Sequence, residues 1–373
     1  MNIGISCYPT IGGSGVVASE LGMALAKRGH QVHFITYAVP NRLDLFCDNI
    51  FYHEVSVPEY PLLEYAPYSL ALASKMADCA QENGLDIIHA HYAIPHAASA
   101  ILARGIIGRG LKVVTTLHGT DVTLVGRNAS FMPITRYAIE QSDHVTVVSE
   151  FLRRDVCDIF TCDKDVKVIY NFIDPKEYRN TISSELRKTL APKGEKLLIH
   201  VSNFRPVKNV MDVLDIFVNV KKEMPTRLIL VGQGPEFPAL EHKAREYGVS
   251  EDVLKMGNKE SVIELLAAAD ILLLPSRTES YGLAALEAMA AGTLPLTSNA
   301  GGLPEVIDHG VSGWMADVGD VTTMSNLAIS TLQDSNLLKN MSRNAQDIAF
   351  DKFNINKALA AYEQLYEQVI TTK

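Results

Sequence analysis

Several features that would place this chain in a common functional class are scarce or missing. Its five cysteines are scattered and form no Cys-x-x-Cys pair, which favours reduced thiols and a cytoplasmic location over a disulfide framework. No apolar segment reaches the ~18 residues that span a bilayer, and no strongly basic amphipathic helix argues for lipid. The net charge of −9 argues against a nucleic-acid-binding surface but leaves room for a local basic pocket.

Two nucleotide-binding motifs are also missing. The first glycine-rich loop covers residues 8–15, between an expected strand and an expected helix. It is not a Gly-x-Gly-x-x-Gly fingerprint, and it lacks the Lys-Ser/Thr ending of a P-loop. The sequence therefore lacks the main motif expected of an NAD-dependent oxidoreductase or of an ATPase. The loop forms either a tight turn or a place where backbone approaches a ligand at a helix start.

The alternation of short apolar runs with longer helical patterns predicts the fold. The 373 residues are 47% hydrophobic and 21% charged, a globular composition long enough for two domains. Expected strands cover residues 2–7, 31–36, 51–57, 86–89, 112–117, 144–148, 166–170, 196–201, 227–231, 253–256, 269–274 and 293–297. Many are apolar throughout, which predicts an α/β fold with two Rossmann-like, doubly wound domains of parallel strands facing across a cleft. We expect an N-terminal acceptor-binding domain over 1–170, a C-terminal nucleotide-sugar-binding domain over 171–352, and a helix in 353–373 that packs back on the first domain.

Two carboxylates, Glu279 and Glu287, stand between an apolar run and a helix-like stretch. Glu279 would lie in the loop after a strand, Gly282 would open the helix, and Glu287 would project from its second turn. The helix start offers free N–H groups to an anion, so flanking carboxylates suit a sugar or another hydroxyl-rich ligand. Acidic residues in a first turn are also common for structural reasons alone.

Other polar side chains follow the remaining strands. Arg205 and Lys208 either clamp a diphosphate or form a solvated basic loop. His89 and His91 lie at the end of one expected strand and have three alternative interpretations. They bind a metal, they contact an acceptor together with Tyr92, or they form hydrogen bonds to the backbone.

Three further polar groups have competing interpretations. His118 follows a strand and suits a hydroxyl ligand, with Asp121 holding its tautomer or capping a helix. Arg136 either binds an anion or pairs with Glu140 on one helix. Asp163-Lys164-Asp165 has the Asp-x-Asp form that some sugar transferases use for a metal, but its place before a strand indicates a turn.

These motifs together resemble the retaining GT-B glycosyltransferases of glycosyltransferase family four, which include sucrose and glycogen synthases. The resemblance covers nearly the whole chain and rests on the Glu279-x7-Glu287 spacing, the Arg205/Lys208 loop, residues 231–234 and residues 301–305. It implies a nucleotide-diphospho-sugar donor with no metal and no cofactor. Residues 7–15, 86–96, 116–121, 170–174 and 200–205 resemble the branch that starts bacillithiol biosynthesis. That branch implies transfer of N-acetylglucosamine from UDP-N-acetylglucosamine to the hydroxyl of L-malate.

The resemblance also assigns roles by position. Catalytic roles go to Glu279, His118, Lys208 and Arg205. Donor binding is implied for Gly13, Asn203, Arg205, Lys208, Asn258, Tyr281, Gly282, Leu283, Ala284 and Glu287. Acceptor binding is implied for Ser14, Tyr92, Thr120 and Arg136. In the wider family an Arg precedes the Lys by five residues, where this chain has Asn203 instead.

Other functions stay open at this point. The acceptor of such a transferase is alternatively a sugar, an inositol phosphate or a lipid, and a non-catalytic nucleotide-sugar-binding protein is a further alternative. Glu279, Lys208 and His118 are all present, which argues against loss of catalytic activity. We expect no nucleic-acid or membrane partner, and a homo-oligomer is compatible with the sequence.

Overall fold

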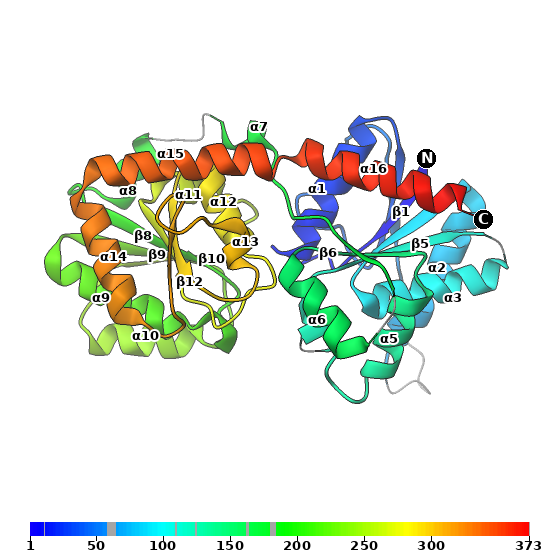
Figure 1. The fold of residues 1–373 in the computed structure, drawn as a ribbon, viewed down its shortest axis with the longest axis horizontal. Helices are drawn as coiled ribbons and strands as arrows, with labels where there is room; N and C mark the ends of the chain where they lie inside the picture. Colours follow the sequence, from blue (N-terminus) through cyan, green and yellow to red (C-terminus); the bar gives the residue numbers. More distant parts are fainter. Residues whose placement is uncertain are drawn as a thin grey trace. The chain divides into compact units, whose positions relative to one another are not determined.

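The computed structural model describes residues 1–10, 12–57, 65–108, 110–123, 125–161, 164–179 and 184–372. It divides into two compact units, unit 1 with Met1–Asn171 and Asn356–Lys373, and unit 2 with Phe172–Ile355 (Figure 1). The boundaries expected from the sequence stand at 170/171 and 352/353. Asp163, part of the expected Asp-x-Asp turn, lies outside the described residues.

Unit 1 is built on a seven-stranded sheet with the order β3-β2-β1-β4-β5-β6-β7, and every adjacent pair is parallel. The strands are β1 (Asn2–Ser6), β2 (Gln31–Thr36), β3 (Ile50–Glu54), β4 (Ile87–His91), β5 (Lys112–Leu117), β6 (His144–Val147) and β7 (Val166–Val168). Helices connect them: α1 (Ser14–Lys27), α2 (Tyr68–Asn83), the π-helix η1 (Ala93–Ala97), α3 (Ala98–Ile107), α4 (Thr120–Thr123), α5 (Met132–Gln141) and α6 (Glu150–Phe160).

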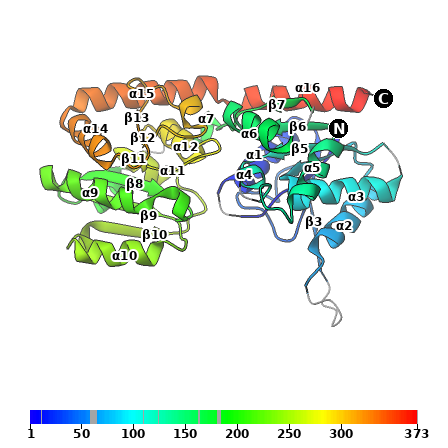
Figure 2. The ribbon, with the colours of Figure 1, turned by 60° about the horizontal axis from the view of Figure 1, so that its bottom comes forward.

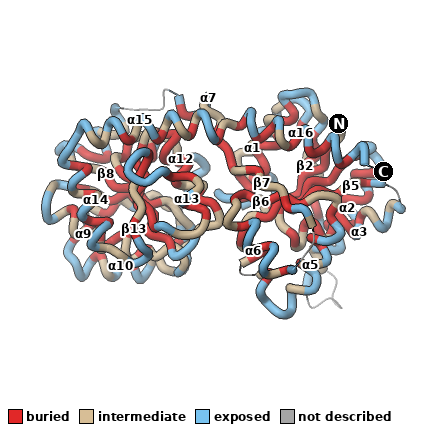
Figure 3. The backbone as a smooth tube through the Cα atoms, in the orientation of Figure 1, coloured by how far each residue is buried: buried red, intermediate tan, exposed pale blue. Residues whose placement is uncertain are grey.

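The central strands of unit 1 are apolar because helices cover the sheet on both faces. β4 is buried along its whole length, and Ile3 of β1 pairs with Ile87 of β4 in the core. Figure 3 shows these strands as a buried layer beneath partly exposed helices. The polar residues at the strand ends are therefore held on a rigid base.

The last helix, α16 (Ile355–Thr371), completes unit 1. Arg28 forms an ion pair with Glu363 at 2.6 Å on its outer side. On the inner side Tyr362 and Tyr366 are buried, and the Tyr366 hydroxyl lies 2.7 Å from His89 Nδ1. The helix is therefore bonded to the strand that carries His89 and His91.

Unit 2 contains a six-stranded, all-parallel sheet with the order β10-β9-β8-β11-β12-β13 (Figure 2). Its strands are β8 (Lys196–Val201), β9 (Thr226–Val231), β10 (Val253–Gly257), β11 (Ile271–Leu274), β12 (Leu294–Ser298) and β13 (Trp314–Ala316). Its helices are α7 (Pro175–Tyr178), α8 (Ser184–Leu190), η2 (Pro206–Lys208), α9 (Val210–Glu223), α10 (Phe237–Glu246), η3 (Ser250–Asp252), α11 (Ile263–Ala268), α12 (Leu283–Ala291), α13 (Leu303–Val306), α14 (Val321–Gln333) and α15 (Ser335–Lys352). The sequence analysis missed β13.

The two sheets confirm the expected α/β class and share one topological property. In unit 1 the strand order reverses between β1 and β4, and in unit 2 it reverses between β8 and β11. Open α/β sheets bind ligands outside the carboxyl ends of their strands at such a switch point. Each unit therefore has one place where a ligand site is expected, and both places coincide with motifs found in the sequence.

Among the helices in the described ranges, none combines the length and apolar character needed to cross a membrane.

Candidate active site

In unit 2, the loops at the carboxyl ends of neighbouring strands carry the expected donor-binding residues. Arg205 and Lys208 follow β8, Asn258 follows β10, the segment from Glu279 to Gly282 follows β11, and Gly301 follows β12. Because β8 and β11 are adjacent in the sheet, the first and third of these loops flank the switch point.

An ion pair joins those two loops. Lys208 Nζ lies 2.6 Å from Glu279 Oε1, and the two side chains are 20% and 12% exposed. The Ser276 hydroxyl donates to the same Oε1 at 2.7 Å. The other oxygen, Oε2, has no hydrogen-bond partner within the described ranges. Glu279 is thus held through one carboxylate oxygen, and the second oxygen makes none of the described hydrogen bonds. Ser276 escaped the sequence analysis, because a serine beside a strand carries no signal of its own.

Close backbone contact holds the Glu279 loop against the loop after β12. Gly301 has φ +63°, and a Cβ added there would lie 2.0 Å from the Glu279 carbonyl oxygen. The Gly302 N–H donates to that same carbonyl at 2.8 Å. A glycine is therefore required at position 301, where it allows this close contact with the Glu279 backbone.

The helix α12 starts beside this loop. Its N-cap, Gly282, has φ 101° and provides no side-chain cap, so the first-turn N–H groups, including those of Leu283 and Ala284, have no side chain capping them. Such N–H groups attract anions. Glu287 is buried in the same helix, and Tyr281 is buried with its ring edge-on to Phe353 at 6.1 Å.

A buried hydrogen-bond chain shapes the loop after β8. His200 Nδ1 lies 2.8 Å from the Leu273 carbonyl, and Nε2 lies 2.7 Å from the Ser202 hydroxyl, which accepts from the Phe204 N–H at 3.1 Å. Burial lowers the pKa of His200 to about 4, so the ring is neutral. Nδ1 then carries the proton, because a carbonyl can only accept. This chain anchors the exposed Asn203 and Arg205, and sequence reasoning did not find it.

In unit 1, three expected acceptor residues are brought together. The side chains of Ser14 and Thr120 lie near that of Tyr92 and act to lower its pKa. Ser14 begins α1 directly after Gly13, Tyr92 follows β4, and Thr120 follows β5. Burial raises the pKa of Tyr92 to about 12, so its phenol is a neutral donor and acceptor. The cluster therefore lies at the carboxyl edge, next to the switch point of this sheet.

His118 lies beside this cluster and is bonded to a second histidine. The rings of Tyr92 and His118 are 5.4 Å apart, and His118 Nε2 lies 2.9 Å from His91 Nδ1. Burial lowers the pKa of His118 to about 3 and that of His91 well below its usual range. Both rings are consequently neutral at physiological pH.

Asp121 does not hold the His118 ring, contrary to one sequence interpretation. Its Oδ1 accepts from the backbone N–H groups of His118 at 3.2 Å and Gly119 at 2.9 Å, and its Oδ2 accepts from Ala93 N–H at 3.2 Å. Burial raises the pKa of Asp121 to about 6 despite these bonds. Asp121 therefore shapes the loop backbone, and His91 is the partner of the ring.

Arg136 and His89 also differ from their interpretations. Arg136 Nη2 donates to Thr161 Oγ1 at 3.4 Å, and no ion pair with Glu140, the alternative interpretation, is described. No hydrogen bond described for Arg136 joins it to the Tyr92 cluster. His89 Nδ1 bonds to Tyr366 and Nε2 to Thr116, each at 2.7 Å, so neither ring nitrogen is available to a metal. In the described ranges no group of three or more His, Cys, Asp or Glu side chains has a metal-binding arrangement.

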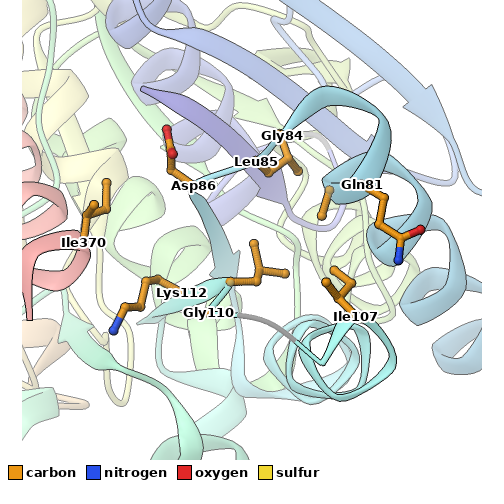
Figure 4. A pocket seen from close by; sticks show the side chains of 10 residues that line it. Gln81, Gly84, Leu85, Asp86, Ile107, Gly110, Lys112 and Ile370 are labelled. Atoms are coloured by element: carbon orange, nitrogen blue, oxygen red, sulfur yellow. The ribbon is translucent and has the colours of Figure 1, made fainter. Parts of the chain in front are cut away.

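An open pocket of about 690 Å³ lies at the opposite edge of the unit 1 sheet (Figure 4). It is lined near the amino ends of β4 and β5 by residues that include Gln81, Asp86, Lys112 and Ile370. Asp86 Oδ2 already accepts from Asn2 N–H at 2.8 Å, and Lys112 Nζ donates to the Thr372 carbonyl at 2.8 Å. None of the expected site residues lines it, so this pocket is separate from the candidate site.

The chain also matches known protein families and relatives. Residues 11–177 match the family model described as Glycosyltransferase Family 4, and residues 182–348 match the model described as Glycosyl transferases group 1. The chain is 46% identical over 371 residues to the N-acetyl-alpha-D-glucosaminyl L-malate synthase of Bacillus anthracis, covering 99% of this chain and 97% of that protein.

Solved structures share the fold over the full length. The sucrose-phosphate synthase of Thermosynechococcus elongatus superposes with a TM-score of 0.83 at 20% identity, covering 100% of both chains. The Anabaena protein HepE, solved in complex with UDP and glucose, gives a TM-score of 0.82 at 21% identity, covering 98% of this chain and 99% of that one. The chain belongs to the GT-B glycosyltransferases and is a glycosyltransferase.

Proposed function

We propose that this enzyme transfers N-acetylglucosamine from UDP-N-acetylglucosamine to the hydroxyl of L-malate with retention of anomeric configuration, the first step of bacillithiol biosynthesis. The observation that carries the proposal is the 46% identity, over 99% of the chain, to the Bacillus anthracis N-acetyl-alpha-D-glucosaminyl L-malate synthase. The arrangement of charged and polar groups in each unit is compatible with that chemistry.

Unit 2 would bind the donor. Lys208, Arg205 and the first-turn N–H groups of α12 would neutralise the diphosphate, and the buried Glu287 would bind the ribose. Asn258, exposed after β10, would lie near the uracil. Glu279 would use its unengaged Oε2 to accept from a sugar hydroxyl.

The reaction breaks the bond between the sugar C1 and the diphosphate oxygen, and the bonding electrons leave with that oxygen. The malate hydroxyl oxygen forms the new bond to C1 on the same face, and its proton passes to the departing phosphate. Negative charge therefore grows on UDP as the bond breaks. Fixed positive groups aimed at that charge stabilise the transition state more than the ground state.

Unit 1 would supply groups for the acceptor and the sugar. His118 would hydrogen-bond the sugar, while Ser14, Tyr92 and Thr120 would bind malate through hydroxyl groups. Arg136 would need to exchange its bond to Thr161 for a malate carboxylate.

We also propose that the reaction needs no metal and no cofactor, since Lys208 and the α12 terminus provide positive charge where a divalent ion would otherwise act. A cytoplasmic location fits the free thiols of Cys7, Cys47, Cys79 and Cys157. Activity that is unchanged by EDTA would support metal independence, and activity restored only by added Mg²⁺ or Mn²⁺ would contradict it.

The test is UDP release from UDP-N-acetylglucosamine with L-malate, D-malate, L-lactate, a simple sugar or an inositol phosphate as acceptor. We expect release with L-malate far above that with water and above every other acceptor. Release with malate no greater than with water would refute the acceptor, and faster release with the sugar or inositol phosphate would reassign it. A Lys208→Met preparation made in parallel reports any contaminating transferase.

A further inference from the structure

Unit 1 contains two histidine pairs with the same hydrogen-bond geometry. In one, His91 Nδ1 lies 2.9 Å from His118 Nε2, and in the other His33 Nδ1 lies 2.9 Å from His53 Nε2. In both pairs the Nε2 of the first ring is buried without a hydrogen-bond partner. The pairs differ in place, because His91 and His118 follow or end the central strands at the candidate site, while His33 and His53 belong to β2 and β3.

The hydrogen bond allows only two proton arrangements. Both rings are neutral, so each carries one proton, and only one of the two facing nitrogens can hold it. If His118 Nε2 carried the proton, His91 Nδ1 would accept the hydrogen bond. The one proton of the His91 ring would then be on Nε2, which would be a buried N–H donor without a partner. If His91 Nδ1 carries the proton, His91 Nε2 is left as a bare acceptor. An orphaned buried N–H is rarer than an under-satisfied acceptor, so the second arrangement is favoured.

We propose that His91 is a positioning residue that holds His118 in the Nδ1–H tautomer by donating from its own Nδ1 to His118 Nε2. His118 then presents an N–H donor to a substrate oxygen. It has no basic nitrogen left for the acceptor hydroxyl, so it is not the group that takes the malate proton. The statement about the substrate rests on the proposed function, whereas the statement about the tautomer does not.

The surroundings of the pair support a fixed ring. His118 Nδ1 has no hydrogen-bond partner in the described part of the chain, so it is available to a ligand. The His91 ring is completely buried and lies 4.4 Å from the His89 ring, whose nitrogens are occupied by Tyr366 and Thr116. The Asp121 carboxylate bonds to backbone N–H groups, so its described bonds offer no competing acceptor to the His118 ring.

The decisive measurement is the tautomer itself. Two-bond ¹H–¹⁵N correlation spectra of the full chain, labelled with ¹⁵N-histidine, distinguish Nδ1–H from Nε2–H rings, and a His118→Asn spectrum identifies the His118 signals. We expect Nδ1–H for His118 in the wild type, loss of that pattern in His91→Leu, and an unchanged pattern in His33→Leu. An Nε2–H ring or a charged ring at His118 in the wild type would overturn the proposal, and this wild-type result stands even if His91→Leu fails to fold.

Kinetics add a second readout with a rescue. Asn places an N–H donor near the position of His Nδ1, so His91→Asn should keep kcat within about threefold, whereas His91→Leu should lower kcat about tenfold, the usual effect of one lost hydrogen bond. His33→Leu should leave kcat unchanged. Equal loss in the Asn and Leu variants would contradict the donor role. A wild type that is inactive with malate would refute the proposed function and leave the tautomer result intact.

Discussion

Replacing Lys208 with Met removes the positive charge of the ion pair with Glu279 while it keeps an unbranched apolar side chain of similar length. The lysine and glutamate side chains are only 20% and 12% exposed, so the charge acts in a partly dehydrated place. Loss of one preorganised donor to a developing oxyanion costs about 2.7–4 kcal/mol, which is roughly 100- to 1,000-fold in kcat. The same change should cost about 1 kcal/mol of stability, because the pair retains partial solvent contact. Activity should therefore collapse while the fold persists.

The assay is UDP release at saturating donor and L-malate, together with a thermal unfolding curve of each variant. Lys243→Met is the matched control, since Lys243 forms an ion pair with Asp215 at 2.8 Å in the same unit with exposures of 27% and 29%. It should lose as much stability as Lys208→Met without losing kcat. A Lys208→Met enzyme with kcat within threefold of the wild type would refute the role of Lys208 at the diphosphate.

Three further predictions concern Gly301, Ser276 and the buried histidines of unit 1. Gly301→Ala should destabilise unit 2 by about 2–4 kcal/mol in urea unfolding, because its Cβ would lie 2.0 Å from the Glu279 carbonyl oxygen. Gly319 also has a positive φ but has open space around it, so Gly319→Ala should cost only about 1–2 kcal/mol. Equal costs for the two variants would contradict the steric argument. Ser276→Ala should lower kcat/KM about tenfold with little change in Tm, since Glu279 Oε1 loses one of two donors; an unchanged kcat/KM would remove Ser276 from the site. The free energy of unfolding should fall as the pH drops from about 6.5 toward 4. Unfolded histidines bind protons below about pH 6.5, whereas burial keeps the pKa of His89, His96 and His118 at about 3 in the folded state. His96→Leu should reduce the slope of stability against pH by up to about 1.4 kcal/mol per pH unit, and an unchanged slope would show that His96 is protonated in the folded protein.

Much of the fold follows from local sequence patterns. The apolar run of β11, the alanine-rich α12 and the two glycines that bound the helix predict a strand, a loop and a helix, and the structure has them there. The strand β13 was missed because it has only three residues, and Trp314 and Met315 within it are half-buried. Such a short edge strand is defined by pairing with β12 and not by its own pattern.

The carboxyl-edge placement of the candidate residues was also predictable, because it follows from strand order. The hydrogen-bond partners of these residues could not be predicted from the sequence. Asp121 is three residues from His118 and was a natural candidate for its partner, yet the ring bonds to His91, which lies 27 residues away. The register that sets His91 beside Thr116 makes this contact, and register is a tertiary property. Arg136 similarly bonds to Thr161 rather than to Glu140 on its own helix. The substrate roles of these residues stay predictions.

The most direct test of the account is the structure of the reaction product. The enzyme is incubated with UDP-N-acetylglucosamine and L-malate, and the product is analysed by mass spectrometry and NMR. We expect N-acetylglucosamine linked to the malate hydroxyl oxygen in the α configuration of the donor. A β-linked product would contradict retention, and free N-acetylglucosamine with no malate adduct would contradict the proposed transfer.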